Sequence, residues 1–405
     1  MAIPLSSYDK TPGTSGHRVA SVDLLRGIVI ILMALDHVRD FWSMTPFSTT
    51  DLDQSTPVYF FTRWVTHFCA PVFMFLCGTS AWLYRRNHLG STQRLSRFLL
   101  TRGLWLILVE ITVISYVWQA TYQMIVFQVI WAIGCSMIVL GFLVFLPRFL
   151  IVGFGLVLVV FHNTLDSIEA ERFPGFEWLW TILHISKLLA VSWMHPIRGI
   201  EVVYPLIPWL GVIALGYGFG ALLELPSGTR QTRTLLIGAL SIAAFLVLRL
   251  LNLYGDSGLG SADAPWHNHG RGAVYAFLSI LNTTKYPPSL HYLLMTLGPA
   301  VALLPLLEKW HGRIADWIMV FGRVPFFFYV LHLYLIHGSA SIWFGIHYDT
   351  WNIAPFDPLT WPADYTPDLV RAYGVWALLL WILYWPCRWF AGIRKKYDYR
   401  WLSYL

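Results

Sequence analysis

The chain has 405 residues, of which 57% are hydrophobic and 12% are charged, and its mean hydropathy is +0.57. Soluble domains carry roughly 25% charged residues, so this composition excludes an ordinary soluble protein and predicts an integral membrane protein. The pI near 9.1 does not indicate binding to nucleic acid, because the basic residues lie in short loops between apolar runs, as in cytoplasmic loops of membrane proteins.

Apolar runs of about 20 residues predict roughly ten membrane-spanning helices and therefore an all-α, polytopic helix bundle. The expected ranges are 19–42, 61–84, 103–120, 124–146, 149–162, 203–222, 235–254, 288–307, 317–339 and 369–387. Most loop Arg and Lys residues fall on one side if the N-terminus is cytoplasmic, so both termini are expected in the cytoplasm. The polar start predicts no cleavable signal peptide. We therefore expect a cytoplasmic tail over 1–17, one membrane domain over 18–390 and a second cytoplasmic tail over 391–405.

Three segments on the outer side are too long to be simple connections. They cover 163–202, 254–287 and 340–368 and are rich in Trp, Pro, Gly and His. We expect them to form a partly ordered cap over the outer face, with an interfacial amphipathic helix over 174–189. Loops rich in Trp and Tyr are suited to stacking on sugar rings, which favours a glycan or glycolipid as the ligand on this side.

The first predicted helix carries an Asp–His pair, Asp36 and His37, at the end of an apolar run. Ionisable side chains inside a membrane are costly, so the pair indicates a functional site. Asp36 points about 100° away from its neighbour around the helix and is badly placed to hold the imidazole ring. Asp40, one turn further on, or a residue from another helix is a better candidate.

Arg26 precedes His37 by eleven residues, which places both on one face of the helix about 16 Å apart. A cation near one membrane surface and an imidazole deeper in the membrane suit an enzyme that takes an anionic donor from one side. Asp23 lies three residues before Arg26. The two residues are either part of such a donor site or only a surface ion pair at the start of the helix.

The second predicted helix places Arg63 and His67 on one face, four residues apart, near the expected position of His37. His67 either handles a proton or an acceptor, or it is a histidine satisfied by its surroundings. Small residues at 78–81 would allow close helix packing. Glu110 and Arg249 each lie within a span and need a partner. Either they pair with one another, or Arg249 and Asn252 face the site.

Lys285 precedes a helix that begins with proline residues, so it either reaches the membrane surface or stabilises negative charge. His332 and His337 are five residues apart, about 140° around a helix, and are not expected to bind one metal together. Of the two, His332 is the candidate that faces the bundle. The motif WHNHGRG at 266–272 lacks a cysteine or carboxylate at ligand spacing, so no metal site is expected. The four cysteines lie in apolar runs and are expected to be buried thiols.

Several of these motifs resemble the bacterial relatives of heparan-α-glucosaminide N-acetyltransferase, which belong to the transmembrane acyltransferases. The resemblance covers most of residues 18–340. Its most specific parts are SVDLLRGIVIILMALDHVRDFW with APVFMFLCGTSAW, and KYPPSLHYLLMTLG; it continues in RFLLTRGLWLILVE, PLIPWLGVIALGYGFG, LNLYGD and GRVPFFFYVLHLYLIH. In the human lysosomal enzyme an Asn stands at the position of His37, and its main catalytic His corresponds here to about 56–57, where this chain has Thr56 and Pro57. This chain therefore looks more like the general membrane acyltransferases.

The resemblance implies a multi-pass enzyme of the bacterial inner membrane that moves an acetyl group from cytoplasmic acetyl-CoA to a hydroxyl or amine of a sugar acceptor on the outer side. It implies that His37 is the general base, with Asp36, Asp40 and His67 as further catalytic candidates. The expected donor-binding residues are Asp23, Arg26, Arg85 and Arg102. The expected acceptor or oxyanion residues are Arg63, Arg249, Asn252, Lys285 and His332.

Direct transfer and an acyl-His intermediate both remain open, as do the acceptor, the length of the acyl chain and the oligomeric state, with a homodimer as one option. A proton-coupled secondary transporter is the alternative function, because the same intramembrane Asp, His, Glu and Arg residues would suit a proton relay. Against it, the sequence shows no matched pair of interrupted helices in two halves. A membrane scaffold is a third option, but it leaves the intramembrane charges unexplained.

Overall fold

The computed structural model describes residues 19–86, 90–191, 197–256, 266–267, 270–356 and 358–397. In these ranges, eight helices are long and apolar enough to cross a membrane. They are Pro57–Tyr84, Thr92–Gln119, Arg148–Leu165, Leu206–Glu224, Ser227–Leu250, Leu290–Leu307, Pro325–Tyr348 and Leu369–Lys396. The protein is thus a polytopic membrane helix bundle, as the composition predicts.

Two further helices complete the set expected from the sequence. Helix α1 (Ala20–Trp42) carries too many charges to be recognised by composition alone, and α6 (Val129–Leu143) is only 15 residues long. The eight spans are formed mainly by the helices α2 (Pro57–Trp64), α3 (Cys69–Tyr84), α4 (Thr92–Val109), α7 (Arg148–Phe161), α9 (Leu206–Gly220), α10 (Ser227–Leu250), α12 (Leu290–Leu307), α14 (Pro325–Tyr348) and α15 (Leu369–Lys396). Short elements are α5 (Ser115–Gln119), α8 (Glu177–Leu183), α11 (Ala273–Leu281) and α13 (Arg313–Arg323).

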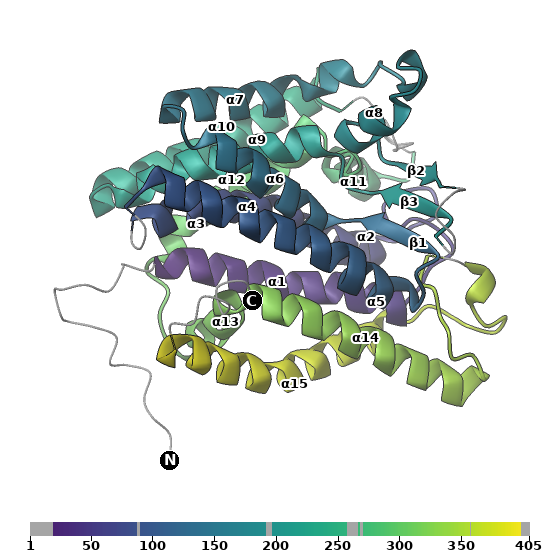
Figure 1. The fold of residues 1–405 in the computed structure, drawn as a ribbon. Coiled ribbons are helices and arrows are strands. Elements are labelled where there is room, and N and C mark those ends of the chain that lie inside the picture. Colours follow the sequence, from purple (N-terminus) through teal and green to yellow (C-terminus); the bar gives the residue numbers. More distant parts are fainter. Residues whose placement is uncertain are drawn as a thin grey trace.

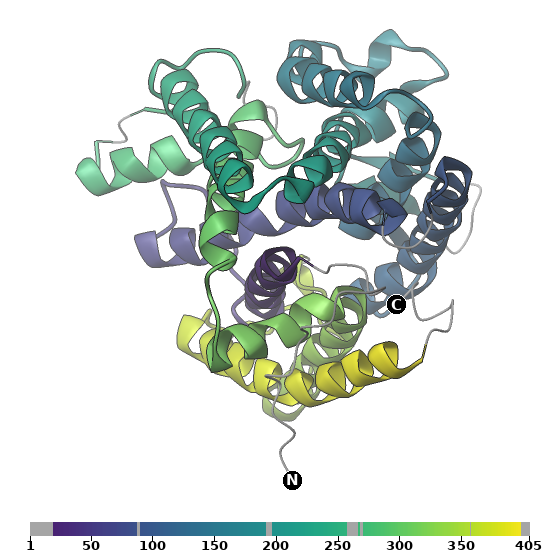
Figure 2. The ribbon, with the colours of Figure 1, turned by 90° about the vertical axis from the view of Figure 1, so that its left-hand side faces the viewer.

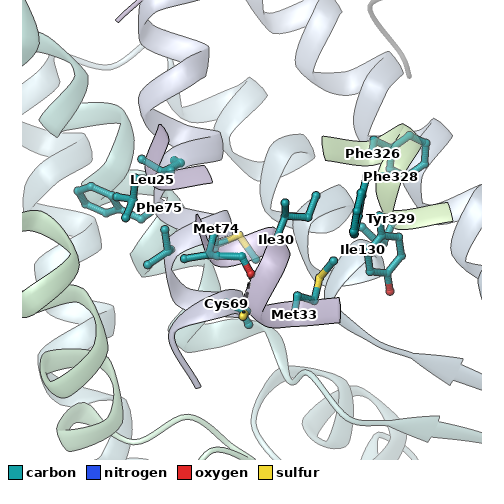
Figure 3. Packing of buried hydrophobic residues seen from close by; sticks show 14 of the residues in the cluster. Leu25, Ile30, Met33, Cys69, Met74, Phe75, Ile130, Phe326, Phe328 and Tyr329 are labelled. Atoms are coloured by element: carbon teal, nitrogen blue, oxygen red, sulfur yellow. Dashed lines mark hydrogen bonds between the residues drawn. The ribbon is translucent and has the colours of Figure 1, made fainter. Parts of the chain in front are cut away.

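Helix α1 runs through the middle of the bundle (Figures 1 and 2). It contacts α3 and α12 on one side and α13, α14 and α15 on the other. Ile30 and Met33 of α1 are buried in the main core. Figure 3 shows Met74 of α3 beside them on one side and Tyr329 of α14 on the other. The charged residues of α1 are therefore surrounded by protein and do not face the lipid, which lowers the free-energy cost of placing them in a membrane.

Helices α3 and α9 pack closely because both carry glycine at the contact. A Cβ atom on Gly78 would lie 2.0 Å from the carbonyl oxygen of Ile213, and one on Gly216 would lie 2.0 Å from that of Phe75. No larger residue fits at either position without moving a helix. The structure thus confirms the close packing predicted for the small residues at 78–81.

A small sheet lies at one end of the bundle beside α8 (Figure 1) and was not predicted. Its strands are β1 (Met124–Phe127), β2 (Lys187–Ala190) and β3 (Gly199–Val202), in the order β1-β3-β2. Strands β1 and β3 are parallel, whereas β2 and β3 are antiparallel. The helix expected over 124–146 was therefore wrong at its start, and the one expected over 174–189 is reduced to α8 followed by β2.

The helix expected over 317–339 was also wrong, because it is two helices, α13 and α14. Val324 separates them with φ −132° and ψ 51°, outside the helical region. Pro325 causes the break, since proline disfavours helical geometry in the residue before it and has no N–H to donate. Helix α14 then continues to Tyr348, so part of the outer segment expected over 340–368 is helical.

Candidate functional site

Two histidines from different helices are in direct contact. His37 of α1 and His332 of α14 approach with 2.8 Å between Nδ1 of His37 and Nε2 of His332. The Nδ1 atom of His332 lies 3.0 Å from the carbonyl oxygen of Phe328, one turn earlier in α14. Because a carbonyl oxygen only accepts, Nδ1 of His332 carries a proton, and Nε2 of the neutral ring accepts from Nδ1 of His37. The lone pair of His37 is then on its Nε2 atom.

Aromatic rings fix the orientation of this pair. The rings of His37 and His332 are stacked, with centroids 5.0 Å apart. The ring of Phe328 also stacks on His332, with centroids 5.1 Å apart. Trp118 of α5 and Tyr329 of α14 meet His37 edge-on at 5.1 and 6.2 Å. His332 is fully buried, whereas His37 is half-buried. Of the two rings, His37 is therefore the one that a substrate can reach.

An ion-pair network surrounds the residues next to His37. Arg39 Nη2 lies 3.1 Å from Asp36 Oδ1 and 2.5 Å from Asp40 Oδ1. Arg63 of α2 donates to the other oxygen of Asp36. Both carboxylates are thus bound by arginine side chains. Of the two options for orienting His37, Asp40 or a residue from another helix, the structure has the second, and that residue is His332.

Lys285 and Tyr286 lie in the turn before α12, on the same side of the bundle. The charge of Lys285 acts on both Asp36 and His37, and its ammonium lies 5.1 Å from the centre of the Tyr286 ring. Burial raises the pKa of Tyr286, but the charges of Lys285 and Arg63 lower it by more, so its pKa lies below the usual value. This corner of the site is therefore electropositive.

His67 lies in a 3-10 turn, Val65–Phe68, between α2 and α3. It is buried, and its ring meets Tyr292 edge-on at 5.6 Å. Its Nδ1 atom has no hydrogen-bond partner in the described ranges. The charges of Lys285 and Arg63 act on it as well. The structure thus gathers His37, Asp36, Asp40, His67, Arg63, Lys285 and His332 from the predicted site residues.

Arg249 belongs to a different network from this site. Its Nη1 atom lies 3.0 Å from Asp256 Oδ2, and the guanidinium also donates to the backbone carbonyls of Ser279, Ile280 and Asn282 at the end of α11. Burial raises the pKa of Asp256. The expected pair of Glu110 with Arg249 was therefore wrong. Asn252 bonds to the backbone of Trp266 and is exposed, so it does not join Arg249 at the site.

Glu110 is completely buried at the start of a π-helical turn, Glu110–Ile114. Its Oε2 atom accepts from the backbone N–H of Trp131 at 2.9 Å, in the first turn of α6. The carboxylate thus binds the N-terminus of a helix, where the helix dipole favours negative charge. The other oxygen, Oε1, has no hydrogen-bond partner within the described part of the chain.

The predicted donor-binding residues lie toward the start of α1. Arg26 donates to Asp23 at 2.9 Å, to Ser80 at 2.8 Å and to the carbonyl oxygen of Gly322 at 3.1 Å, so it ties α1 to α3 and α13. Arg85 donates to the hydroxyl of Tyr217 at 3.2 Å. The charges of Arg26 and Arg102 both act on Cys77 of α3. These basic residues therefore share one region of the bundle.

Several residues around the site were not found from the sequence: Trp118, Tyr329, Tyr286, Asp256 and His162. The aromatic residues are three of 67 Trp, Tyr and Phe residues in the chain, and nothing in their spacing separates them from membrane-facing ones. Tyr286 was within reach, because it is next to Lys285. His162 donates from Nε2 to the carbonyl oxygen of Pro288 at 2.8 Å and so supports the Lys285 turn.

All four cysteines are free thiols. Among the residues that the structure describes, no group of three or more His, Cys, Asp or Glu side chains is placed to hold a metal ion. His267 of the 266–272 motif is described, whereas His269 lies outside the described residues.

Comparison with known protein families assigns residues 18–255 to the domain described as "Heparan-alpha-glucosaminide N-acetyltransferase, catalytic". No curated protein matches the chain. The matched range includes His37, Asp36, Arg63 and His67 and ends just before Asp256. It covers more than half of the chain and is consistent with the motifs at 21–42 and 70–82. The chain therefore belongs to the heparan-α-glucosaminide N-acetyltransferase family of membrane acetyltransferases.

Proposed function

We propose that this protein transfers an acetyl group from cytoplasmic acetyl-CoA to a hydroxyl or amine of a sugar or glycan on the outer side of the membrane, with His37 as general base. The family uses acetyl-CoA as its donor. The observation that carries the proposal is the contact of His37 with His332, because the bond to His332 leaves the lone pair on Nε2 of the half-buried ring. A neutral imidazole with a free lone pair can accept a proton.

In the proposed reaction, the acceptor oxygen or nitrogen forms a bond to the thioester carbonyl carbon while its proton moves to Nε2 of His37. The carbonyl oxygen gains the negative charge of the tetrahedral intermediate. Reformation of the carbonyl breaks the bond from carbon to sulfur, and the leaving thiolate takes the proton from Nε2, which gives CoA and restores neutral His37. Lys285 and Arg63 would stabilise the negative charge that develops during this step.

An acetylated His37 is the alternative route. In that case Nε2 attacks the thioester, CoA leaves first, and the acceptor then takes the acetyl group. The two routes differ in their kinetics: direct transfer needs both substrates bound together, whereas the covalent route releases CoA before the acceptor binds. The direct route is our proposal, and the order of CoA release and acceptor binding tests it against the covalent route.

The donor would enter from the end of the bundle where α1 begins. Arg26, Arg85 and Arg102 lie in this region and would bind the phosphates of CoA, with Asp23 holding Arg26. Along α1, Arg26 is about 16 Å from His37, a span that the pantetheine arm can cover. With this direction of entry, we propose that both termini, with tails 1–17 and 391–405, are cytoplasmic and that the acyltransferase domain, 18–390, lies in the inner membrane of a bacterium.

The acceptor would approach from the opposite end, where the loops are rich in aromatic residues. Strand β1 contacts α5, whose Trp118 touches His37, so the outer elements are connected to the site. An acceptor with sugar rings would stack on such aromatic side chains. The family assignment favours this enzyme over the alternative of a proton-coupled transporter.

The test uses protein purified in detergent, acetyl-CoA labelled in the acetyl group and a panel of amino sugars and glycans. We expect free CoA to appear only when an acceptor is present, with the label recovered on the acceptor in equal amount. If the protein releases free CoA from acetyl-CoA when no acceptor is present, its activity is hydrolysis of the thioester and not transfer. Protein that binds no CoA would contradict the proposal, and uptake driven by an ion gradient in liposomes would bring the transporter forward.

A further inference from the structure

Three buried polar atoms on the α5–α14 side of His37 have no hydrogen-bond partner among the residues that the structure describes. They are the indole N–H of Trp118, the hydroxyl of Tyr329 and Oε1 of Glu110. Their residues are 4%, 4% and 0% exposed, so bulk water does not satisfy them. Burying a polar group without a partner costs free energy, and three such groups near one catalytic candidate call for a common explanation.

The three groups are close to one another in the fold. Trp118 and Tyr329 both meet the His37 ring edge-on, with centroids 5.1 and 6.2 Å from it. The charge of Glu110 acts on Tyr329. Helix α5 directly follows the π-helical turn that starts at Glu110, and α5 packs against α14. Figure 3 shows Tyr329 beside Ile130, whose neighbour Trp131 donates its backbone N–H to Glu110.

The hydrogen-bonding capacity of this cluster is two donors and one acceptor. Trp118 only donates, the Tyr329 hydroxyl can donate, and the carboxyl oxygen Oε1 of Glu110 can accept. The reactive end of an acyl-CoA has the complementary groups, since the thioester carbonyl accepts and the N–H of the nearest pantetheine amide donates. The match is to this end of the donor and not to its phosphates, because the cluster contains a carboxylate and no cation.

We propose that Trp118, Tyr329 and Glu110 form the subsite for the thioester end of the acyl donor. Trp118 and Tyr329 donate to the thioester carbonyl oxygen, and Glu110 accepts from the adjacent amide N–H. The subsite rests on the proposed function, since it places the carbonyl carbon beside His37. Donors to the carbonyl oxygen also stabilise the negative charge that forms on it during transfer.

Binding measurements test the subsite without relying on turnover. Calorimetry would compare the binding of acetyl-CoA, in the absence of acceptor, with that of S-ethyl-CoA, a thioether that keeps the pantetheine amides but has no thioester carbonyl. Tyr329→Phe and Trp118→Phe should weaken acetyl-CoA about 10-fold each, as expected for the loss of one hydrogen bond to a bound ligand, and should leave S-ethyl-CoA unchanged. Glu110→Leu should weaken both ligands, because it removes the oxygen that accepts from the amide N–H.

The melting temperature provides the second readout. Tyr329→Phe removes a hydroxyl that has no partner, so the melting temperature of the free protein should stay the same or rise while acetyl-CoA binding falls. Tyr334→Phe on α14 and Trp381→Phe on α15 are matched controls, because both side chains are exposed, and they should change neither quantity. If Trp118→Phe proves unstable, the Tyr329→Phe comparison decides by itself.

Two results would overturn the inference, and they differ from each other. If Tyr329→Phe and Trp118→Phe bind acetyl-CoA as wild type does, or lose affinity for both ligands equally, the subsite is wrong and the proposed function still stands. If wild-type protein binds neither ligand, the proposed function fails, and the subsite fails with it.

Discussion

Nδ1 of His37 lies 2.8 Å from Nε2 of His332, and His332 is itself bound through Nδ1 to the carbonyl oxygen of Phe328. This chain of bonds does for His37 what a carboxylate does in a Ser-His-Asp triad: it fixes the tautomer and orients the ring. A neutral partner is suited to a buried position, because a carboxylate there would have to be desolvated. His332 is therefore proposed as a positioning residue.

Replacing His332 should lower the rate without abolishing binding of the donor. We expect His332→Ala to reduce kcat about 10- to 100-fold, since the tautomer and orientation of His37 are no longer fixed. His332→Gln should retain more activity, because its carbonyl oxygen can still accept from Nδ1 of His37. Steady-state kinetics of both variants would check this. Equal losses in the two variants would argue against a role through hydrogen bonding.

The proposed base also predicts a pH dependence. A general base works only when it is unprotonated, so kcat/KM should fall on the acidic side with the slope of a single proton. His332→Gln should move the midpoint of this fall, because the group that bonds to His37 has changed, whereas the exposed control His347→Ala should not. The measurement is kcat/KM against pH for the three proteins. A profile that stays flat down to the lowest pH at which the protein remains folded would contradict the assignment.

The pair of Asp36 with Arg63 should contribute to the stability of the folded protein, apart from the role proposed for Arg63 in catalysis. Removing one partner of a buried ion pair leaves the other charge unpaired and costs about 3–5 kcal/mol of stability. Because the side chains of Arg63 and Asp36 are still 16% and 10% exposed, we expect a loss at or below the lower end of this range. We expect Arg63→Gln to lower the melting temperature clearly. Asp364→Asn, at an exposed position, is the control and should leave the melting temperature unchanged.

Arg249 should act on the site only through the fold. It is fully buried and binds Asp256 together with three carbonyls at the end of α11, just before the turn that carries Lys285. Arg249→Ala should therefore destabilise the protein by about 3–5 kcal/mol, whereas Asn252→Ala, on an exposed side chain, should have a small effect. Thermal unfolding in detergent compares the two. Equal effects would mean that the network around Arg249 is not important for stability.

The donor end makes a separate prediction about CoA. Arg85→Gln and Arg102→Gln should raise KM for acetyl-CoA several-fold with little change in kcat, because charge contacts to phosphates bind substrate and transition state alike. The effect should shrink at high salt, which screens exposed charges. Unchanged KM in both variants would move the entry of the donor away from this end.

Much of the architecture could be predicted from the sequence, because the bilayer allows few solutions. Long apolar runs have to be helices, and an Asp–His pair inside one of them is too costly to be accidental. Hydropathy did not predict the structure correctly where a proline or a strand pairing overrides it. Pro325 divides an apolar run that reads as one helix, and the residues at 124–127 form a strand because β3, more than 70 positions later in the chain, pairs with them.

The partners within the site were less predictable, because they depend on how helices are rotated against one another. The spacing around His37 excluded Asp36 as its orienting group, but no pattern in the sequence distinguishes His332 from Asp40 as the alternative. The pairing of Arg249 was missed for a similar reason. Its partner Asp256 is seven residues away in a loop, whereas the cost of a buried charge made a partner inside the spans the expectation.

The most direct test of the central claim is acceptor-dependent release of CoA from acetyl-CoA by His37→Ala, measured against wild type and the exposed control His347→Ala. All three proteins should have the same melting temperature within a few degrees. The account predicts that His347→Ala releases CoA at the wild-type rate and that His37→Ala releases essentially none. A folded His37→Ala protein with wild-type activity would contradict the account and move the base to His67 or His332.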